Sequence, residues 1–131
     1  MITVIIPALN EEATIDFVVR LAMQSVNVTE VIVVDDKSMD NTVATARQAG
    51  ATVITSTKLG KGASMKDGVL VTKNNIIVFL DADITTYPSN IIALLTDPIL
   101  QGSADFVKSY FSRQAGRVTE LVAKPLLSIL Y

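Results

Sequence analysis

Short apolar runs alternate with longer amphipathic segments along the chain. The runs are rich in Val and Ile, which favours strands, and they occur at residues 3–6, 31–34, 52–54, 76–80 and, more weakly, 106–110. The intervening and following segments have helical spacing, at residues 11–24, 41–49, 63–72, 88–100 and 117–130. The order strand, helix, strand, helix therefore predicts an α/β fold.

The character of two runs refines this fold. Residues 31–34 and 76–80 are continuously apolar, which indicates strands that are buried on both faces. We therefore predict a doubly wound, mainly parallel sheet, whose ligands gather beyond the C-terminal ends of the strands. Boundary residues fit this order, with Asn10 as an N-cap, Pro88 as the first residue of a helix and Gly50 as a C-terminal stop.

Size and composition indicate one cytoplasmic domain. The chain has 131 residues, of which 50% are hydrophobic and 18% charged, so it can bury a core. It begins without a signal-peptide pattern and has no apolar run of membrane-spanning length, so we expect no transmembrane segment. Because Cys and His are absent, acid–base or metal chemistry within the chain must use carboxylates, Lys, Tyr or groups of the substrate.

Charge is distributed unevenly along the chain. The net charge of -2 argues against general nucleic-acid binding. Residues 108–124 nevertheless contain four basic residues and one acidic residue. Two explanations remain open for this segment, a site for a small anionic ligand or a solvated basic helix face.

The fourth apolar run, residues 76–80, is followed directly by the tripeptide Asp81-Ala82-Asp83. In an extended segment the side chains alternate between two faces, so the two carboxylates would point the same way. Mg²⁺ typically takes one or two protein carboxylates together with phosphate oxygens and water. The pair therefore predicts a site for a metal-bound diphosphate, with capping of the next helix as the simpler alternative.

Two further strand ends carry candidate chemistry. Gly60-Lys61-Gly62 stands before a predicted helix, where backbone N–H groups, the helix dipole and an ammonium could hold phosphate. Asp36 ends the second strand and could accept a hydrogen bond from the ring N–H of a nucleobase. The alternative for Gly60-Lys61-Gly62 is a tight turn with an exposed Lys. The alternative for Asp36 is capping of the next helix.

Taken together, these loops resemble the nucleotide-sugar half of a GT-A-fold, family 2-like glycosyltransferase, which is Rossmann-like. The resemblance is carried by residues 5–12, 33–42, 60–62 and 80–83. Residues 115–127 are similar to the acceptor segment of glucosyl-3-phosphoglycerate synthases, retaining enzymes that move glucose from a nucleotide donor onto 3-phosphoglycerate. The resemblance covers essentially the whole chain.

The resemblance implies roles for individual residues in donor binding. The residues that would bind the donor are Pro7, Ala8, Leu9, Asn10, Glu11, Asp36, Lys61, Asp81 and Ala82. Residues 7–11 would surround the uridine, Asp36 would meet the uracil and Lys61 would approach the diphosphate. Asp83 would bind a divalent metal, Mg²⁺ or Mn²⁺, directly.

The resemblance also implies an acceptor site. The residues that would receive the phosphoglycerate are Gly116, Arg117, Val118 and Thr119. A helix beginning near residue 116 would add its positive end to this anion site. Residues 1–100 would then be the donor-binding region and residues 101–131 the start of the acceptor region of a single domain. No enzymic nucleophile is assigned, because retaining transferases of this kind often show none.

Members of that family continue beyond the position of Tyr131, with further strands, the rest of the acceptor pocket and a His that completes the metal site. We therefore expect a fragment of a longer protein or a short product without the catalytic half. The apolar tail at residues 121–131 would lack its cover, which predicts a homodimer. A polyprenyl-phosphate sugar synthase and a non-catalytic nucleotide-binding or oligomerisation module are the alternative functions.

Overall fold

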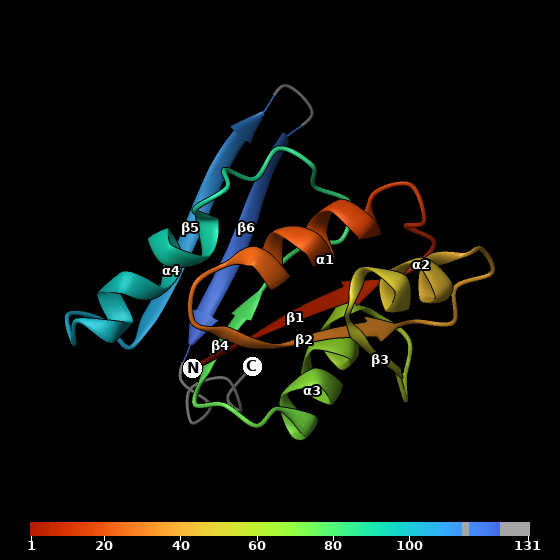
Figure 1. The fold of residues 1–131 in the computed structure, drawn as a ribbon, viewed down its shortest axis with the longest axis horizontal. Helices are drawn as coiled ribbons and strands as arrows, with labels where there is room; N and C mark the ends of the chain where they lie inside the picture. The colour runs from red at the N-terminus through yellow and green to blue at the C-terminus, as the bar shows by residue number, and fades with distance from the viewer. Residues whose placement is uncertain (114–115, 124–131) are drawn as a thin grey trace.

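In a computed structural model, the chain forms a six-stranded sheet with helices on both faces (Figure 1). The structure describes residues 1–113 and 116–123, with side chains as far as residue 105 and at residue 107. The elements in chain order are β1 (Ile2–Ala8), α1 (Ile15–Gln24), β2 (Val28–Asp35), α2 (Thr42–Ala49), β3 (Thr52–Thr55), α3 (Lys61–Val71), β4 (Ile76–Phe79), α4 (Ile91–Leu100), β5 (Phe106–Arg113) and β6 (Gly116–Ala123).

The sheet has the strand order β3-β2-β1-β4-β6-β5. The first four of these strands are parallel, whereas β6 runs antiparallel to both β4 and β5. The predicted doubly wound, mainly parallel sheet is therefore confirmed. Because parallel strands end at the same edge of a sheet, the segments that follow β1, β2 and β4 meet there.

Strand β1 contributes to the core on both faces of the sheet. Its residues Val4 and Ile6 belong to the larger apolar cluster, which includes the buried faces of α1, α2 and α4. Ile5 points the other way and packs in a second cluster with Val34 of β2 and Met65 of α3. This alternation follows from the period of two along a strand, and it explains why β1 is buried almost throughout.

The predicted C-terminal helix is wrong for the part of it that the structure describes. Residues 116–123 form β6, which pairs with β5 from Arg113↔Gly116 to Phe106↔Ala123 and also with β4. Val118, Leu121 and Val122 have helical spacing, but pairing along two neighbouring strands outweighs this local preference. The helix N-terminus expected near residue 116 therefore does not contribute to an anion site. Residues 124–130 of the predicted helix lie outside the described residues.

The helix boundaries confirm one of three predicted boundary residues. Gly50 ends α2 with a φ of 112°, the left-handed conformation that favours glycine at a helix C-terminus. Asn10 is not an N-cap, because α1 begins at Ile15, and Pro88 lies just before α4 instead of inside its first turn. In both cases a loop continues past the residue that the sequence pattern favours as the helix start.

Two further expectations concern the membrane and the oligomeric state. In the described part of the chain, no helix has the length and apolar character needed to cross a membrane. Of the apolar tail at residues 121–131, residues 124–131 lie outside the described residues, so the homodimer stays a prediction.

Close packing of α3 against β1 and β2 depends on Gly68. A Cβ atom at this position would lie 2.6 Å from Cγ2 of Ile5 and 3.3 Å from Cγ2 of Val34, both buried. At Gly62, in the same helix, an added Cβ would meet nothing within 4 Å. Gly68 therefore sets the distance between α3 and the sheet.

We predict that Gly68→Ala destabilises the chain by about 1–3 kcal/mol, because the added methyl group overpacks the interface. The matched variant Gly62→Ala should be neutral or more stable by up to about 1 kcal/mol, since Ala has the better helix propensity. Urea unfolding of both variants measures the difference. Equal stability of the two would show that α3 does not pack on the sheet at this distance.

Candidate functional site

A cleft of about 380 Å³ lies at the C-terminal ends of β1, β2 and β4. It is lined by Pro7, Ala8, Leu9, Glu11, Asp36, Gly60, Lys61, Ser64, Asp81, Ala82 and Asp83. The predicted donor residues thus lie together, with the exception of Asn10, and the predicted metal ligand lies with them. The four segments that carry the resemblance, residues 5–12, 33–42, 60–62 and 80–83, meet here because the parallel strands end side by side.

Backbone hydrogen bonds extend the pairing of β1 and place the acidic segments on either side of its end. The N–H of Asp36 donates to the carbonyl of Ala8 at 2.9 Å. On the other side, the N–H of Leu80 donates to the carbonyl of Ile5 at 3.1 Å. Asp36 and the residues that follow Leu80 therefore flank the end of β1.

The loop after β1 is tied to the loop after β2 by Asn10. Its N–H donates to Ser38 Oγ at 2.9 Å, and its Oδ1 accepts from the N–H of Met39 at 2.8 Å. Its φ of 53° lies in the left-handed region, which Asn tolerates better than most residues. Asn10 thus fixes the shape of the cleft wall, and its side chain does not line the cleft.

The segment before α3 is held in the same way. Asp67 accepts from the N–H of Thr57 at 2.7 Å, and this hydrogen bond, more than any other contact, lowers the pKa of Asp67. Gly60 has a φ of 102°, and its N–H donates to Asp36 Oδ2 at 3.1 Å. These contacts place Lys61, the first residue of α3, at the cleft.

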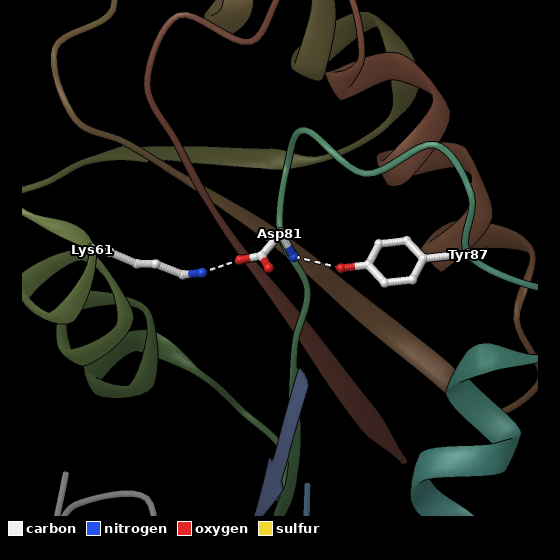
Figure 2. Close-up of polar contacts among 3 residues, drawn as sticks. All are labelled: Lys61, Asp81 and Tyr87. Atoms are coloured by element: carbon white, nitrogen blue, oxygen red, sulfur yellow. Dashed lines mark hydrogen bonds and ion pairs between the residues drawn. The ribbon is translucent and has the colours of Figure 1, made fainter. Parts of the chain in front are cut away.

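Figure 2 shows the contacts that fix Asp81. The ammonium of Lys61 forms an ion pair with Asp81 Oδ1, and the N–H of Asp81 donates to the hydroxyl oxygen of Tyr87 at 2.9 Å. The carbonyl of Ala82 accepts from Thr14 Oγ1 at 2.8 Å. The backbone of this segment is therefore held from two sides.

The geometry of the Asp81-Ala82-Asp83 segment differs from the expected one. The strand β4 ends at Phe79, and residues 82 and 83 form a turn, so the alternation of an extended strand does not apply. Asp81 is engaged by Lys61, whereas Asp83 is exposed and makes no hydrogen bond within the described residues. Both carboxylates nevertheless line the same cleft.

Negative charge dominates the cleft. Among the side chains that the structure describes, four acidic ones line it, Glu11, Asp36, Asp81 and Asp83, against the one ammonium of Lys61. Burial and, next, the charge of Asp83 raise the pKa of Glu11 above its ordinary value. A cation would relieve this repulsion.

A divalent cation fits this donor set only as an open site. In the described part of the chain, no three Asp or Glu side chains group closely enough to hold a metal by themselves. Mg²⁺ is commonly held by one or two carboxylates, with substrate phosphates and water as the other ligands. The exposed carboxylate of Asp83 suits such a site.

Three residues at the site were not predicted: Thr14, Ser64 and Tyr87. Ser64 lies one helical turn before Gly68 on the same face of α3, so helix periodicity could have indicated its position. Tyr87 and Thr14 act through hydrogen bonds to the Asp81–Ala82 backbone, and no sequence spacing signals such contacts.

The predicted acceptor residues, Gly116 to Thr119, belong to β6. Pairing with β4 covers Leu121 to Ala123, so the first half of β6 extends past the end of β4, at the same end of the sheet as the cleft (Figure 1). The structure does not describe the side chains of residues 116–119.

Comparison with known proteins gives the family. The model of the family described as "Glycosyl transferase family 2" matches residues 3–119. The chain belongs to glycosyl transferase family 2. The glucosyl-3-phosphoglycerate synthase of Mycobacterium tuberculosis is 35% identical over 98% of this family 2 chain and 48% of its own length. The chain therefore spans about half the length of the curated relatives it matches.

Solved structures agree with this assignment. The glucosyl-3-phosphoglycerate synthase of M. tuberculosis in complex with Mn²⁺, UDP-glucose and phosphoglyceric acid superposes with a TM-score of 0.87 at 29% identity. Its complex with Mg²⁺ and UDP also gives 0.87, at 28% identity. Both comparisons cover 97% of this chain and 57% of the other. The predicted GT-A-type fold is confirmed.

We predict that Asp83→Asn lowers the pKa of Glu11 toward its ordinary value, because the substitution removes the neighbouring negative charge. A ¹³C NMR titration of the Glu11 carboxyl measures this shift. Asp97→Asn, a change of the same kind on α4, should leave the titration unchanged. An unchanged pKa in Asp83→Asn would contradict the proximity of the two carboxylates.

The raised pKa also has a consequence for stability. The folded chain binds the Glu11 proton more tightly than the unfolded chain does, so protonation of Glu11 stabilises the fold. This stabilisation is fully present below the pKa that Glu11 has in the unfolded chain. It is lost as the pH rises through the pKa of Glu11 in the folded chain. Between these two pKa values, the free energy of unfolding should therefore depend less on pH in Asp83→Asn than in the wild type.

Proposed function

We propose that this chain is the donor-binding part of a metal-dependent, retaining glycosyltransferase that transfers glucose from UDP-glucose to 3-phosphoglycerate. The observation that carries the proposal is the cleft at the strand ends of a family 2 chain, with its carboxylates and Lys61 at the start of α3. The likeness to structures in complex with UDP-glucose, phosphoglyceric acid and Mn²⁺ supports these ligands. We assign residues 1–100 to the donor region and residues 101–131 to the start of the acceptor region.

The charge of the cleft supports a requirement for metal. A diphosphate entering alone would be repelled by the excess of three carboxylates among the described residues that line the cleft. We assign Asp83 as the direct ligand of Mg²⁺ or Mn²⁺, with the diphosphate and water completing the coordination. When bound, the cation supplies Lewis-acid stabilisation of the leaving diphosphate.

The nucleoside would occupy the part of the cleft formed by the ends of β1 and β2. Pro7, Ala8 and Leu9 offer an apolar wall for the uridine. Asp36 Oδ1 is buried without a partner in the described residues, so it can accept from the ring N–H of uracil. Glu11 is assigned to the ribose hydroxyls, and Asn10 contributes by holding the loop.

The diphosphate would lie between the start of α3 and the Asp81–Ala82 segment. Lys61 would exchange its ion pair with Asp81 for a charge-assisted hydrogen bond to the diphosphate. The backbone at Asp81 and Ala82 remains held by Tyr87 and Thr14 during this exchange. Lys61 thereby stabilises the negative charge that grows as the bond to the sugar breaks.

The acceptor would lie beside the first half of β6. Gly116, Arg117, Val118 and Thr119 supply backbone N–H groups, a guanidinium and a hydroxyl, which suit an anion such as phosphoglycerate. Their place at the same end of the sheet as the cleft supports this assignment.

The proposal is tested by calorimetric titration of the chain with UDP, followed by a transfer assay. We expect UDP to bind about 10-fold or more tightly with Mn²⁺ or Mg²⁺ than without, and glucose transfer to require 3-phosphoglycerate. Faster transfer to polyprenyl phosphate would favour the lipid-linked alternative, and binding without any transfer would favour a non-catalytic module. Absence of UDP binding with either metal would contradict the donor site.

We predict that Lys61→Met weakens UDP binding in the presence of Mn²⁺ by about 10–100-fold, because a charge-assisted hydrogen bond to the diphosphate is lost. Binding of uridine, which has no phosphate, should change little. Lys66→Met provides the control, since Lys66 lies on the same helix, is exposed and does not line the cleft. An equal loss for UDP and uridine would assign Lys61 a different role.

A further inference from the structure

Two buried polar side-chain atoms in the described part of the chain lack a hydrogen-bond partner, and both belong to residues that line the cleft. They are Asp36 Oδ1 and Ser64 Oγ. Ser64 is only 1% exposed. Buried hydroxyls are nearly always hydrogen-bonded in native proteins, because burial without a partner destabilises the fold. An unpaired hydroxyl at a ligand cleft therefore indicates a partner that the ligand supplies.

The packing of α3 shows which part of the cleft Ser64 faces. Gly68 lies against Ile5 of β1 and Val34 of β2, and Ser64 stands one turn earlier on the same helix face. The helix runs opposite to the strands, since Lys61 lies at their C-terminal ends and Thr72 Oγ1 donates to Thr3 Oγ1 near their start. Ser64 is therefore displaced from Gly68 toward the C-terminal ends of β1 and β2.

This displacement brings Ser64 over the residues that follow Ile5 and Val34 on the same sheet face. One helical turn rises about 5.4 Å and two strand residues rise about 6.6 Å, so the matching strand positions are Pro7 and Asp36. The β1–β2 seam is separated by β1 from β4 and thus from the Asp81–Asp83 segment. Ser64 accordingly belongs to the nucleoside part of the cleft, beside the second unpaired atom.

We propose that the Ser64 hydroxyl reads the nucleobase together with Asp36. The edge of a uracil presents a ring N–H between two carbonyl oxygens. A protein can recognise this edge with an acceptor for the N–H and an adjacent donor for one of the carbonyl oxygens. Asp36 Oδ1 supplies the acceptor and Ser64 supplies the donor to one of the carbonyl oxygens. This inference rests on the proposed function, because it requires a nucleotide in the cleft.

The Ser64→Ala variant tests the proposal through two effects of opposite sign. Without ligand, we expect its Tm to rise by about 2–6 °C, because the buried unpaired hydroxyl is removed. With Mn²⁺, we expect its Kd for UDP to rise by about 5–20-fold, whereas its Kd for pyrophosphate should not change. A hydroxyl that serves only the fold would instead give a lower Tm.

Thio-substituted nucleotides identify the hydrogen bond itself, because sulfur is a weaker acceptor than oxygen. We expect the wild type to bind one of the two analogues, 2-thio-UDP or 4-thio-UDP, more weakly than it binds UDP. Ser64→Ala should bind that analogue and UDP equally well. The control is Ser103→Ala, which removes a hydroxyl that donates to the carbonyl of Pro98. Ser103 does not line the cleft, so this variant should bind every ligand like the wild type.

The outcomes separate this inference from the proposed function. Wild-type protein that binds no UDP with metal overturns both. Normal UDP binding by the wild type together with an unchanged Kd in Ser64→Ala overturns the inference alone. An equal loss of UDP and pyrophosphate in Ser64→Ala also overturns it, since the hydroxyl would then act on the diphosphate.

Discussion

The burial of β1 between two parallel neighbours is the constraint on which the rest of the structure depends. Both edges of this strand are paired and both of its faces are covered, so its end is fixed in position. The hydrogen bonds from Asp36 to Ala8 and from Leu80 to Ile5 then carry the acidic segments to the two sides of that end. The cleft is therefore a direct consequence of strand register, because the register alone brings the loops that line it close together.

Stability and ligand binding make opposite demands at this cleft. Backbone positions are held firmly, by Asn10, Asp67, Tyr87 and Thr14, whereas several functional side chains are left with unfavourable electrostatics or without partners. Glu11 and Asp83 repel one another, and the hydroxyl of Ser64 is buried unpaired. Such groups destabilise the free chain, and a cation and a nucleotide would supply the missing interactions. The pattern is that of a site pre-organised for a charged ligand.

Most of the sheet and the position of the cleft could be predicted from the sequence, because Val- and Ile-rich runs mark strands and acids after parallel strands must converge. Asp36 and Asp83 were predicted in this way, and Lys61 was predicted from its place between two glycines before a helix. The strand β6 was missed because Val118, Leu121 and Val122 fit a helical period, and only pairing with β4 and β5 decides between the two structures. Tyr87 was missed for a related reason, since its hydroxyl contacts the backbone of Asp81, which the fold and not the local sequence brings near it. The position of Ser64, in contrast, could have been indicated by the helical period that it shares with Gly68.

The central claim is that a metal–nucleotide complex binds at the C-terminal ends of the parallel strands. Paramagnetic broadening of ¹H–¹⁵N NMR signals by Mn²⁺ in the presence of UDP tests it most directly. We expect the amide signals of Glu11, Asp81 and Asp83 to be broadened most, and those of Thr29 and Asn74, which are hydrogen-bonded to each other at the opposite ends of the strands, to be broadened least. Strongest broadening at Thr29 and Asn74, or uniform broadening along the chain, would contradict the claim.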